Sequence, residues 1–224
     1  IGFRNYVTIL PSVGCAGEVA TRIANHVEGA VAIIHHQGCI QLGSDLEVTV
    51  RTLIGLGRNP NVAAVLVVGL GCESVSPEKL ADEIAKSKKP VETIIIQELG
   101  GTVKTIERGV TIARKMVQYA SEIKRKPVDV DALTLGIKCG ASDATSGIAA
   151  NPATGVASDM VIEGGSTVIF GETTELIGAE HILARRAISE EGVFASKSHA
   201  IEYALKRLMR EETRKPHILI DRTT

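Results

Sequence analysis

The segment Ala63-Ala-Val-Leu-Val-Val68 is an uninterrupted apolar run dominated by valine, leucine and alanine. A short run of this kind is typical of a strand that helices cover on both faces of a parallel sheet, since neither face then requires polar residues. The surrounding apolar stretch, Val62 to Leu70, is far below the ~20 residues that a membrane-spanning helix needs. The run therefore predicts an inner strand of a soluble α/β sheet.

Outward from this run, short β-branched segments alternate with longer amphipathic ones along the chain. Such alternation predicts parallel strands joined by right-handed crossovers through helices. We expect an open, mostly parallel sheet of about six strands with helices on both faces, a doubly wound, Rossmann-like α/β fold. The other predicted strands are Tyr6–Leu10, Ala30–Ile34, Glu92–Ile96, Leu133–Ile137 and Thr167–Phe170, and the predicted helices are 17–28, 43–57, 76–87, 102–123, 145–163, 173–188 and 196–212.

The segment from Ser121 to Asp131 is polar, carries clustered lysine and arginine, and contains Pro127. It reads as a surface connection between two halves of the sheet. We expect residues 1–224 to form a single α/β domain, with a sub-boundary near 121–131. The sequence starts at Ile1 rather than at methionine, so we expect it to be a fragment of a longer chain.

Composition excludes several classes of partner. The formal net charge of the 224 residues is −1, which provides no basic field for nucleic acid and no cationic face for a membrane. Nothing at the start of the sequence has the charged-then-apolar pattern of a signal segment. We therefore expect a cytoplasmic protein that binds neither nucleic acid nor membrane. With aromatic residues at 3% and no tryptophan, its core must be aliphatic.

All four cysteines follow predicted strands. In parallel sheets, ligands bind beyond the carboxyl ends of the strands, so these positions share the functional rim. Taken singly, a cysteine beside a glycine in such a turn is more often a small packing residue than a ligand. Taken together, four thiols with His35, Glu73, Asp143 and Glu172 on the same rim favour a soft-metal or iron–sulfur site. The cysteines are Cys15, Cys39, Cys72 and Cys139.

Glycine-rich turns on the same rim suggest weaker hypotheses. Gly69-Leu-Gly71 lacks the third glycine and the acidic partner of a dinucleotide fingerprint, so nucleotide binding is poorly supported. Gly100-Gly101-Thr102 opens a long predicted helix, whose free N–H groups favour a carboxylate. Lys104 and Arg4 are candidates to add positive charge there, although either fits an ordinary surface position equally well.

Six motifs occur in a fixed order, and together they carry a resemblance to the altronate dehydratase and galactarate dehydratase family, which includes the large subunit of sulfolactate sulfo-lyase. The sixth motif, with its long cysteine-to-proline span, is the most specific. The motifs are Gly2-Phe-Arg-Asn5, Ser12-Val-Gly-Cys15, His35-His-Gln-Gly-Cys39-Ile-Gln-Leu-Gly43, Arg58-Asn-Pro-Asn61, Val67-Val-Gly-Leu-Gly-Cys-Glu73, and Cys139-Gly-Ala-Ser-Asp143 with Ser146-Gly-Ile-Ala-Ala-Asn-Pro152, followed by Gly178-Ala-Glu180.

The resemblance implies a hydro-lyase that removes water from a hexarate or hexonate to give a 2-keto-3-deoxy product, or a sulfo-lyase that eliminates sulfite. It also implies iron, as a ferrous ion or an iron–sulfur cluster, with manganese as an alternative. Implied roles are iron ligation for the four cysteines, catalysis for His35, Glu73 and Asp143, and substrate binding for Ser142, Ser146 and Asn151. The anion-binding helix start adds Arg4 and Thr102 as candidate substrate-binding residues. His36 is an alternative to His35, and at most one of the two should point into the site, because adjacent strand residues face opposite ways.

The resemblance also bears on partners. Family members carry a further C-terminal glycine-rich domain, so we expect this chain to act with a missing C-terminal domain or a partner subunit. A homo-oligomer is a reasonable expectation for an enzyme of this kind. The alternative from another class is a non-catalytic α/β module that binds an anionic metabolite or a nucleotide.

Overall fold

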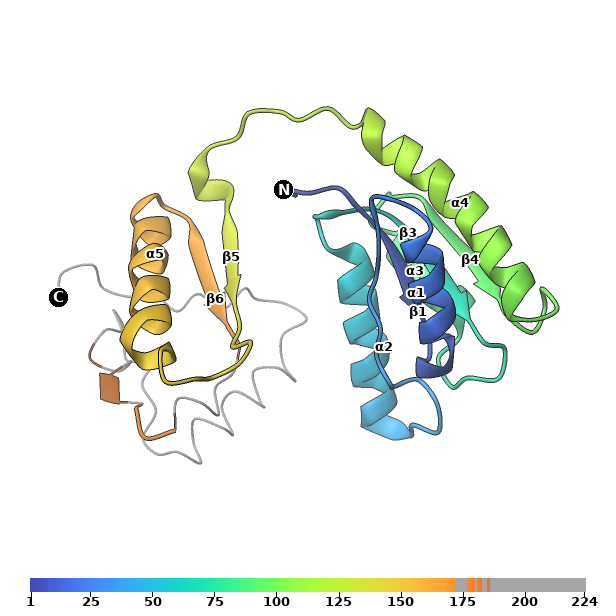
Figure 1. The fold of residues 1–224 in the computed structure, drawn as a ribbon, viewed down its shortest axis with the longest axis horizontal. Helices are drawn as coiled ribbons and strands as arrows, with labels where there is room; N and C mark the ends of the chain where they lie inside the picture. Colours follow the sequence, from blue (N-terminus) through green and yellow to red (C-terminus); the bar gives the residue numbers. More distant parts are fainter. Residues whose placement is uncertain (172–176, 180, 183–184, 186–224) are drawn as a thin grey trace. The chain divides into compact units, whose positions relative to one another are not determined.

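The computed structural model describes residues 1–171, 177–179, 181, 182 and 185 (Figure 1). The chain divides into two compact units, Ile1–Lys126 and Pro127–Thr224. This division falls inside the polar connection 121–131 that the sequence marks as a sub-boundary. The expectation that residues 1–224 act as one domain stays a prediction, and each unit is described by itself below.

The first unit contains a sheet of four strands, β1 (Tyr6–Pro11), β2 (Ala30–Ala32), β3 (Val62–Gly69) and β4 (Val91–Ile95). The strand order is β2-β1-β3-β4, and every neighbouring pair is parallel. The strand that the apolar run predicts, β3, lies inside the sheet between β1 and β4, and all eight of its residues are buried. Its position explains its composition, since helices cover both of its faces.

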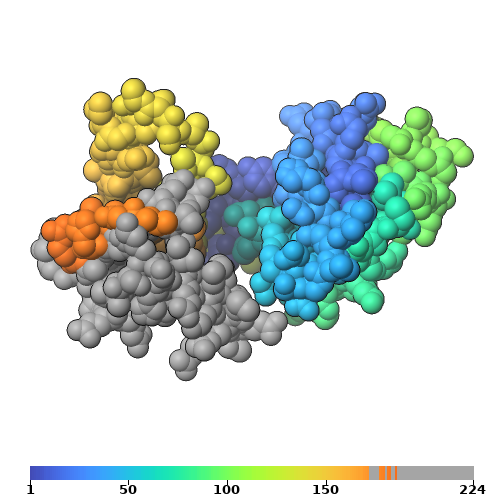
Figure 2. Space-filling model, turned by 90° about the horizontal axis from the view of Figure 1, so that it is seen from below, coloured from blue at the N-terminus to red at the C-terminus, as the bar shows by residue number. Residues whose placement is uncertain are grey.

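Four helices complete this unit: α1 (Gly17–Asn25), α2 (Gly43–Arg58), α3 (Pro77–Ala85) and α4 (Thr102–Glu122). Helix α1 packs with α4, and α2 packs with α3. Figure 1 shows α2 and α4 on opposite sides of the sheet, and in Figure 2 they form opposite sides of the unit, in light blue and light green. The doubly wound α/β class is therefore confirmed.

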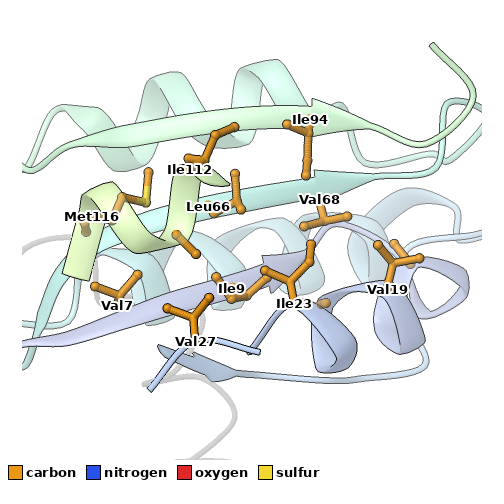
Figure 3. Packing of buried hydrophobic residues seen from close by; sticks show 14 of the residues in the cluster. Val7, Ile9, Val19, Ile23, Val27, Leu66, Val68, Ile94, Ile112 and Met116 are labelled. Carbon is orange, nitrogen blue, oxygen red and sulfur yellow. The ribbon is translucent and has the colours of Figure 1, made fainter. Parts of the chain in front are cut away.

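The period of two along each strand divides the core between the two faces. In β3, Leu66 and Val68 point to the cluster beneath α1 and α4, whereas Val65 and Val67 point to the cluster beneath α2 and α3. Figure 3 shows the first cluster, in which Ile23 of α1 and Ile112 of α4 lie over the strands. The core is aliphatic, as composition predicts.

The second unit contains a smaller sheet of two parallel strands. Strand β5 (Thr134–Ile137) pairs with β6 (Thr167–Phe170), and helix α5 (Asn151–Glu163) connects them. A π-helical turn, Ser146–Ala150, leads directly into α5. Two short 3₁₀ turns, Gly14–Ala16 and Val130–Ala132, precede α1 and β5 respectively.

The six predicted strands all form, but they divide over two sheets of four and two strands instead of sharing one. The second strand is shorter than predicted: it ends at Ala32, although Ile33 N–H still donates to the Ile9 carbonyl at 3.2 Å. The predicted helix 145–163 begins with the π-helical turn. The predicted helix 196–212 and the predicted rim residue Glu172 lie outside the described residues, as does most of 173–188. No helix among the described residues is both long and apolar enough to span a bilayer.

Candidate active site at the carboxyl edge of the first sheet

The strand order creates a switch point in the first unit. From β1 the chain crosses to β2 on one side, and β3 then returns to the other side of β1. At such a point, the loops that leave neighbouring strands lead to opposite faces of the sheet, and ligands of open α/β sheets bind beside them at the carboxyl edge. The loops that follow β1 and β3 are such a pair, and they contain Cys15 and Cys72. The predicted functional rim is therefore a structural feature of this unit.

Three loops interlock at the switch point. The Ser12 hydroxyl, after β1, donates a hydrogen bond of 2.7 Å to Glu73 Oε1, after β3. The loop after β2 joins both neighbours, because its Gln37 carbonyl accepts from Gly14 N–H at 2.9 Å and its Gly38 carbonyl accepts from Ser74 N–H at 3.0 Å. Each of the three loops is thus held by direct hydrogen bonds to another.

Gly38 is required where these loops meet. Its φ is +101°, in the left-handed half of the Ramachandran plot that disfavours side chains. A Cβ atom at this position would lie 2.4 Å from the Ser12 carbonyl oxygen and 2.9 Å from Val13 Cα. Both of these atoms belong to the backbone, so they cannot move aside as a flexible side chain would. The motif glycine before Cys39 therefore allows the second loop to pack directly on the first.

Glu73 is a hydrogen-bond acceptor for these loops. Its Oε1 also accepts from Leu70 N–H at 2.9 Å, and its Oε2 accepts from Gly71 N–H at 2.6 Å. Partial burial raises the pKa of Glu73, but the hydrogen bonds from the Ser12 hydroxyl and from the two backbone N–H groups outweigh burial and hold the pKa below its ordinary value. Glu73 is therefore an ionised carboxylate that orders the loop bearing Cys72.

We expect the Glu73→Gln variant to have a free energy of unfolding about 1 kcal/mol lower than wild type at neutral pH, because a neutral amide replaces a charged acceptor. The pKa of Glu73 is lowered in the folded protein, so its stabilising contribution is full above the unfolded value of 4.5 and is lost as pH falls through the folded value. The difference between wild type and variant, measured by urea unfolding, should shrink below pH 4.5. A difference that stays constant down to pH 3 would contradict this assignment.

The two adjacent histidines differ in their surroundings. His35 is half-buried; its Nε2 lies 2.8 Å from the Pro11 carbonyl oxygen, and its Nδ1 accepts from Gln37 N–H at 3.1 Å. Both ring nitrogens of the predicted base are therefore engaged with backbone groups. His36 is exposed, and no hydrogen bond or ion pair of its side chain is found within the described residues.

The cysteines lie where the sequence predicts, just past strand ends, and none of the four forms a disulfide. Cys15, Cys39 and Cys72 are exposed on the three interlocked loops, whereas Cys139 follows β5 in the second unit. Within the described residues, no three His, Cys, Asp or Glu side chains are grouped closely enough to hold a metal ion. The thiols of the first unit thus share one edge without forming a closed ligand set, and the four-cysteine iron site stays a prediction.

The structure places Arg4 and Thr102 at opposite edges of the first sheet. Arg4 precedes β1, where its backbone N–H donates to Asn61 Oδ1 at 3.0 Å. Thr102 is the first residue of α4, beyond the carboxyl end of the parallel strand β4, after two glycines of positive φ. The structure therefore does not bring Arg4 to the helix start with which the sequence analysis associates it.

The second unit brings four predicted residues together. A pocket of about 340 Å³ lies beyond the carboxyl ends of β5 and β6, at the start of the π-helical turn. Cys139 Sγ lies 3.9 Å from Ser142 Oγ. The lining is mostly small or polar, which suits a ligand with hydroxyl groups. The predicted residues in it are Cys139, Ser142, Ser146 and Asn151, and the others include Lys138, Thr154 and Phe170.

Asp143 orders the turn beside this pocket. Its Oδ1 accepts from the Thr145 hydroxyl at 2.6 Å and from Thr145 N–H at 2.7 Å, and its own N–H donates to Ser146 Oγ at 2.9 Å. The hydrogen bond from the Thr145 side chain, followed by that from its backbone, lowers the pKa of Asp143. In the structure, this predicted catalytic residue orders Thr145, the residue that precedes the π-helical turn.

The sequence predicts no role for some residues of these sites. Ser12 belongs to a motif, but only the structure shows that its side chain is fully buried and links two loops. Lys138 and Thr154 line the pocket of the second unit without having been named. The helical period could have indicated that Thr154 lines the pocket, because it lies one turn after Ala150, whose carbonyl oxygen accepts from the Thr154 hydroxyl. For Ser12 no local signal exists, because its partner is 61 residues away.

The doubly wound sheet, with cysteines and histidines on interlocked loops at its switch point, defines a doubly wound α/β protein with its chemically reactive side chains at the carboxyl edge. Comparison with known families then identifies it more closely. The family model "D-galactarate dehydratase/Altronate hydrolase, second domain" matches residues 1–121, and "D-galactarate/Altronate dehydratase, C-terminal" matches residues 130–215. The chain belongs to the D-galactarate/altronate dehydratase family, a family of lyases.

The second match bears on the expected C-terminal domain. Residues 130–215 are similar to the C-terminal region of this family, so this chain contains at least part of that region. The two family models also meet in the same segment in which the structure separates its two units. The units of the structure therefore correspond to two family regions.

Individual relatives span the same family. The chain is 44% identical over 191 residues to (2R)-sulfolactate sulfo-lyase subunit beta of Chromohalobacter salexigens, covering 85% of this chain and 48% of the relative. It is 34% identical to altronate dehydratase of Bacillus subtilis, covering 85% and 40%. It is 39% identical to galactarate dehydratase (L-threo-forming) of Escherichia coli, covering 64% and 29%. The chain thus spans less than half the length of each of these relatives.

Proposed function

We propose that this chain is part of a dehydratase that eliminates water from a hexarate or hexonate, altronate or galactarate, to give a 2-keto-3-deoxy acid. The observation that carries the proposal is the set of interlocked loops at the switch point, which present thiols and an imidazole to solvent in a family of lyases. Ligands of doubly wound sheets bind beyond the carboxyl ends of the strands at a switch point. The family membership supplies the class of reaction.

The proposed elimination has three physical requirements. A base must remove a weakly acidic proton from the carbon next to the carboxylate, and an acid must protonate the departing hydroxyl. The negative charge that develops on the carboxylate must be stabilised by positive charge or by hydrogen-bond donors. Histidine can serve as both base and acid near neutral pH, and exposed histidine is available on the loop after β2.

The pocket of the second unit supports the same substrate class. Ser142, Ser146 and Asn151 offer hydroxyl and amide groups, which can both donate to and accept from the hydroxyls of a sugar acid. We propose that these three residues bind the polyhydroxy chain. Asp143 holds Ser146 in place through its backbone N–H and thus supports that role indirectly.

A second candidate function is elimination of sulfite from (2R)-sulfolactate. It is favoured by the 44% identity to the sulfo-lyase subunit beta, which is higher than the identity to the dehydratases quoted above. The reaction type is the same, since a group leaves from the carbon next to the one that loses its proton. That relative is named as a subunit, so we propose a partner subunit if this chain belongs to a sulfo-lyase. If it belongs to a dehydratase, we propose a homo-oligomer.

The two candidates are distinguished by their products. The full-length protein, prepared without oxygen and supplied with ferrous iron, should be incubated separately with altronate, galactarate and sulfolactate, and 2-keto acid and sulfite should be measured. We expect 2-keto acid from a sugar acid without sulfite. Sulfite from sulfolactate alone would support the second candidate. Neither product, with all three substrates, would reject both eliminations and leave the anion- or nucleotide-binding alternative.

Iron binding by the cysteines is a separate proposal, supported by the exposed free thiols that share one edge of the first sheet. Thiolates favour iron clusters and other soft-metal sites. We expect the anaerobically reconstituted protein to retain iron, with manganese as the alternative metal, and Cys39→Ser to lower the bound metal measured by mass spectrometry. Ser44→Ala, an exposed change near the start of α2, is the matched control. Equal iron content in wild type and Cys39→Ser would remove Cys39 from the ligand set.

A further inference from the structure

The loop after β2 carries two adjacent histidines, and its hydrogen bonds distinguish them. A carbonyl oxygen can only accept a hydrogen bond, so the 2.8 Å contact between His35 Nε2 and the Pro11 carbonyl places the proton on Nε2. A backbone N–H can only donate, so the 3.1 Å contact from Gln37 requires an unprotonated Nδ1. The network thus assigns His35 as the neutral Nε2–H tautomer, with neither ring nitrogen available to a substrate.

These contacts instead give His35 a positioning role. Pro11 is the last residue of β1, and Gln37 is the residue whose carbonyl accepts from Gly14 N–H. The His35 ring therefore ties the loop bearing Cys39 to the end of the strand that leads to Cys15. Loss of its ring would remove one of the links between these two loops, while the hydrogen bond from Gly14 N–H to the Gln37 carbonyl would remain.

His36 has the opposite character. Its side chain is exposed and makes no hydrogen bond or ion pair with the part of the chain that the structure describes. Its backbone packs so closely on the loop after β1 that a Cβ on Gly14 would lie 2.9 Å from His36 Cα. With its backbone held in place and its ring nitrogens open to solvent, His36, unlike His35, can exchange a proton with a bound substrate.

We propose that His36, rather than His35, is the catalytic imidazole of the elimination, an inference that rests on the proposed function. Its neutral ring takes the proton from the carbon next to the carboxylate, the electron pair of that C–H bond becomes the C=C bond, and the C–O bond to the hydroxyl breaks. The resulting imidazolium returns the proton to the departing hydroxide, which leaves as water. The enol product then tautomerises to the 2-keto acid, and the imidazole is regenerated.

The test replaces three histidines one at a time in the full-length protein. We expect His36→Gln to lower kcat on the substrate that wild type turns over by about 10²- to 10³-fold, with an unchanged melting temperature. His26→Gln, at an exposed position just after α1, should leave kcat within twofold. His35→Gln keeps a donor to Pro11 but loses the acceptor for Gln37, so it should lower the melting temperature. Turnover retained by His36→Gln would overturn the proposal.

A second measurement does not depend on turnover. Diethyl pyrocarbonate acylates neutral, accessible imidazole nitrogens, and fragment mass spectrometry can locate the label on either of two adjacent residues. His36 should be labelled faster than His35, and altronate, galactarate or sulfolactate should slow the labelling of His36. Equal labelling, or no protection by any of these acids, would overturn the proposal. Absence of both products with wild type would refute the proposed function and, with it, this role of His36, whereas products formed equally by wild type and His36→Gln would refute the role of His36 alone.

Discussion

The Gly38→Ala variant should lose about 3 kcal/mol of unfolding free energy. The new Cβ would lie 2.4 Å from the Ser12 carbonyl oxygen, and the residue would have to keep a φ of +101°. Backbone strain of this kind costs about 1–3 kcal/mol, and overpacking against atoms that cannot move aside costs a similar amount. The loop after β2 must therefore move away from the loop after β1, which also separates His36 from Gly14.

Gly101→Ala is the matched control for this variant. Gly101 has a similar φ of +108°, but a Cβ there would meet no atom within 4 Å. It should therefore show the strain without the clash, a loss of about 1–2 kcal/mol. Urea unfolding of wild type and both variants gives the comparison. If Gly38→Ala cost no more than Gly101→Ala, the loops would not be packed as tightly as the structure shows.

Leu66→Ala should lower the unfolding free energy by about 2–5 kcal/mol. Leu66 is fully buried in β3, between β1 and β4, and faces the cluster beneath α1 and α4 (Figure 3). Truncation of Leu66 removes apolar contacts with neighbouring strands and with the helices above them. Strand β3 cannot shift to fill the resulting cavity, because a shift would break its hydrogen bonds to both β1 and β4. Thermal or urea unfolding measures the loss.

The control is a large apolar residue of the same unit that is mostly exposed. Ile34 keeps 63% of its surface in water, so Ile34→Ala should change the unfolding free energy by less than about 1 kcal/mol. A loss for Leu66→Ala as small as that for Ile34→Ala would mean that β3 is not the inner strand of the sheet. The pair of variants thus tests the strand order itself.

Much of the fold follows from local sequence. Apolar runs bounded by turn residues predict every strand, and Ser76 with Pro77 predicts the start of α3, where the Ser76 hydroxyl accepts from Lys79 N–H at 3.2 Å. The division of the six strands between two sheets does not follow, because a run of β-branched residues indicates that a strand forms but not which strand it pairs with. The polar segment 121–131 was the only local sign of the boundary.

The candidate site was predicted in part. The cysteines lie past strand ends as expected, because a strand and the turn after it are both encoded within a few residues. The second unit gathers Cys139, Ser142, Ser146 and Asn151 into one pocket because they lie on one turn and the helix that follows it. Arg4 and Thr102, in contrast, lie on different edges of the sheet. The sequence does not show at which end of the sheet a residue lies until the directions of the strands are known.

The inner strand Ala63–Val68, the doubly wound class and the cysteine positions were determined by sequence alone, since each depends on neighbouring residues and on the period of two along a strand. Only the tertiary structure decided that Glu73 is a hydrogen-bond acceptor and that His36, not His35, is uncommitted. The physical reason is distance along the chain. Glu73 meets Ser12 across 61 residues and His35 meets Pro11 across 24, and such partners become neighbours only when β1, β2 and β3 align.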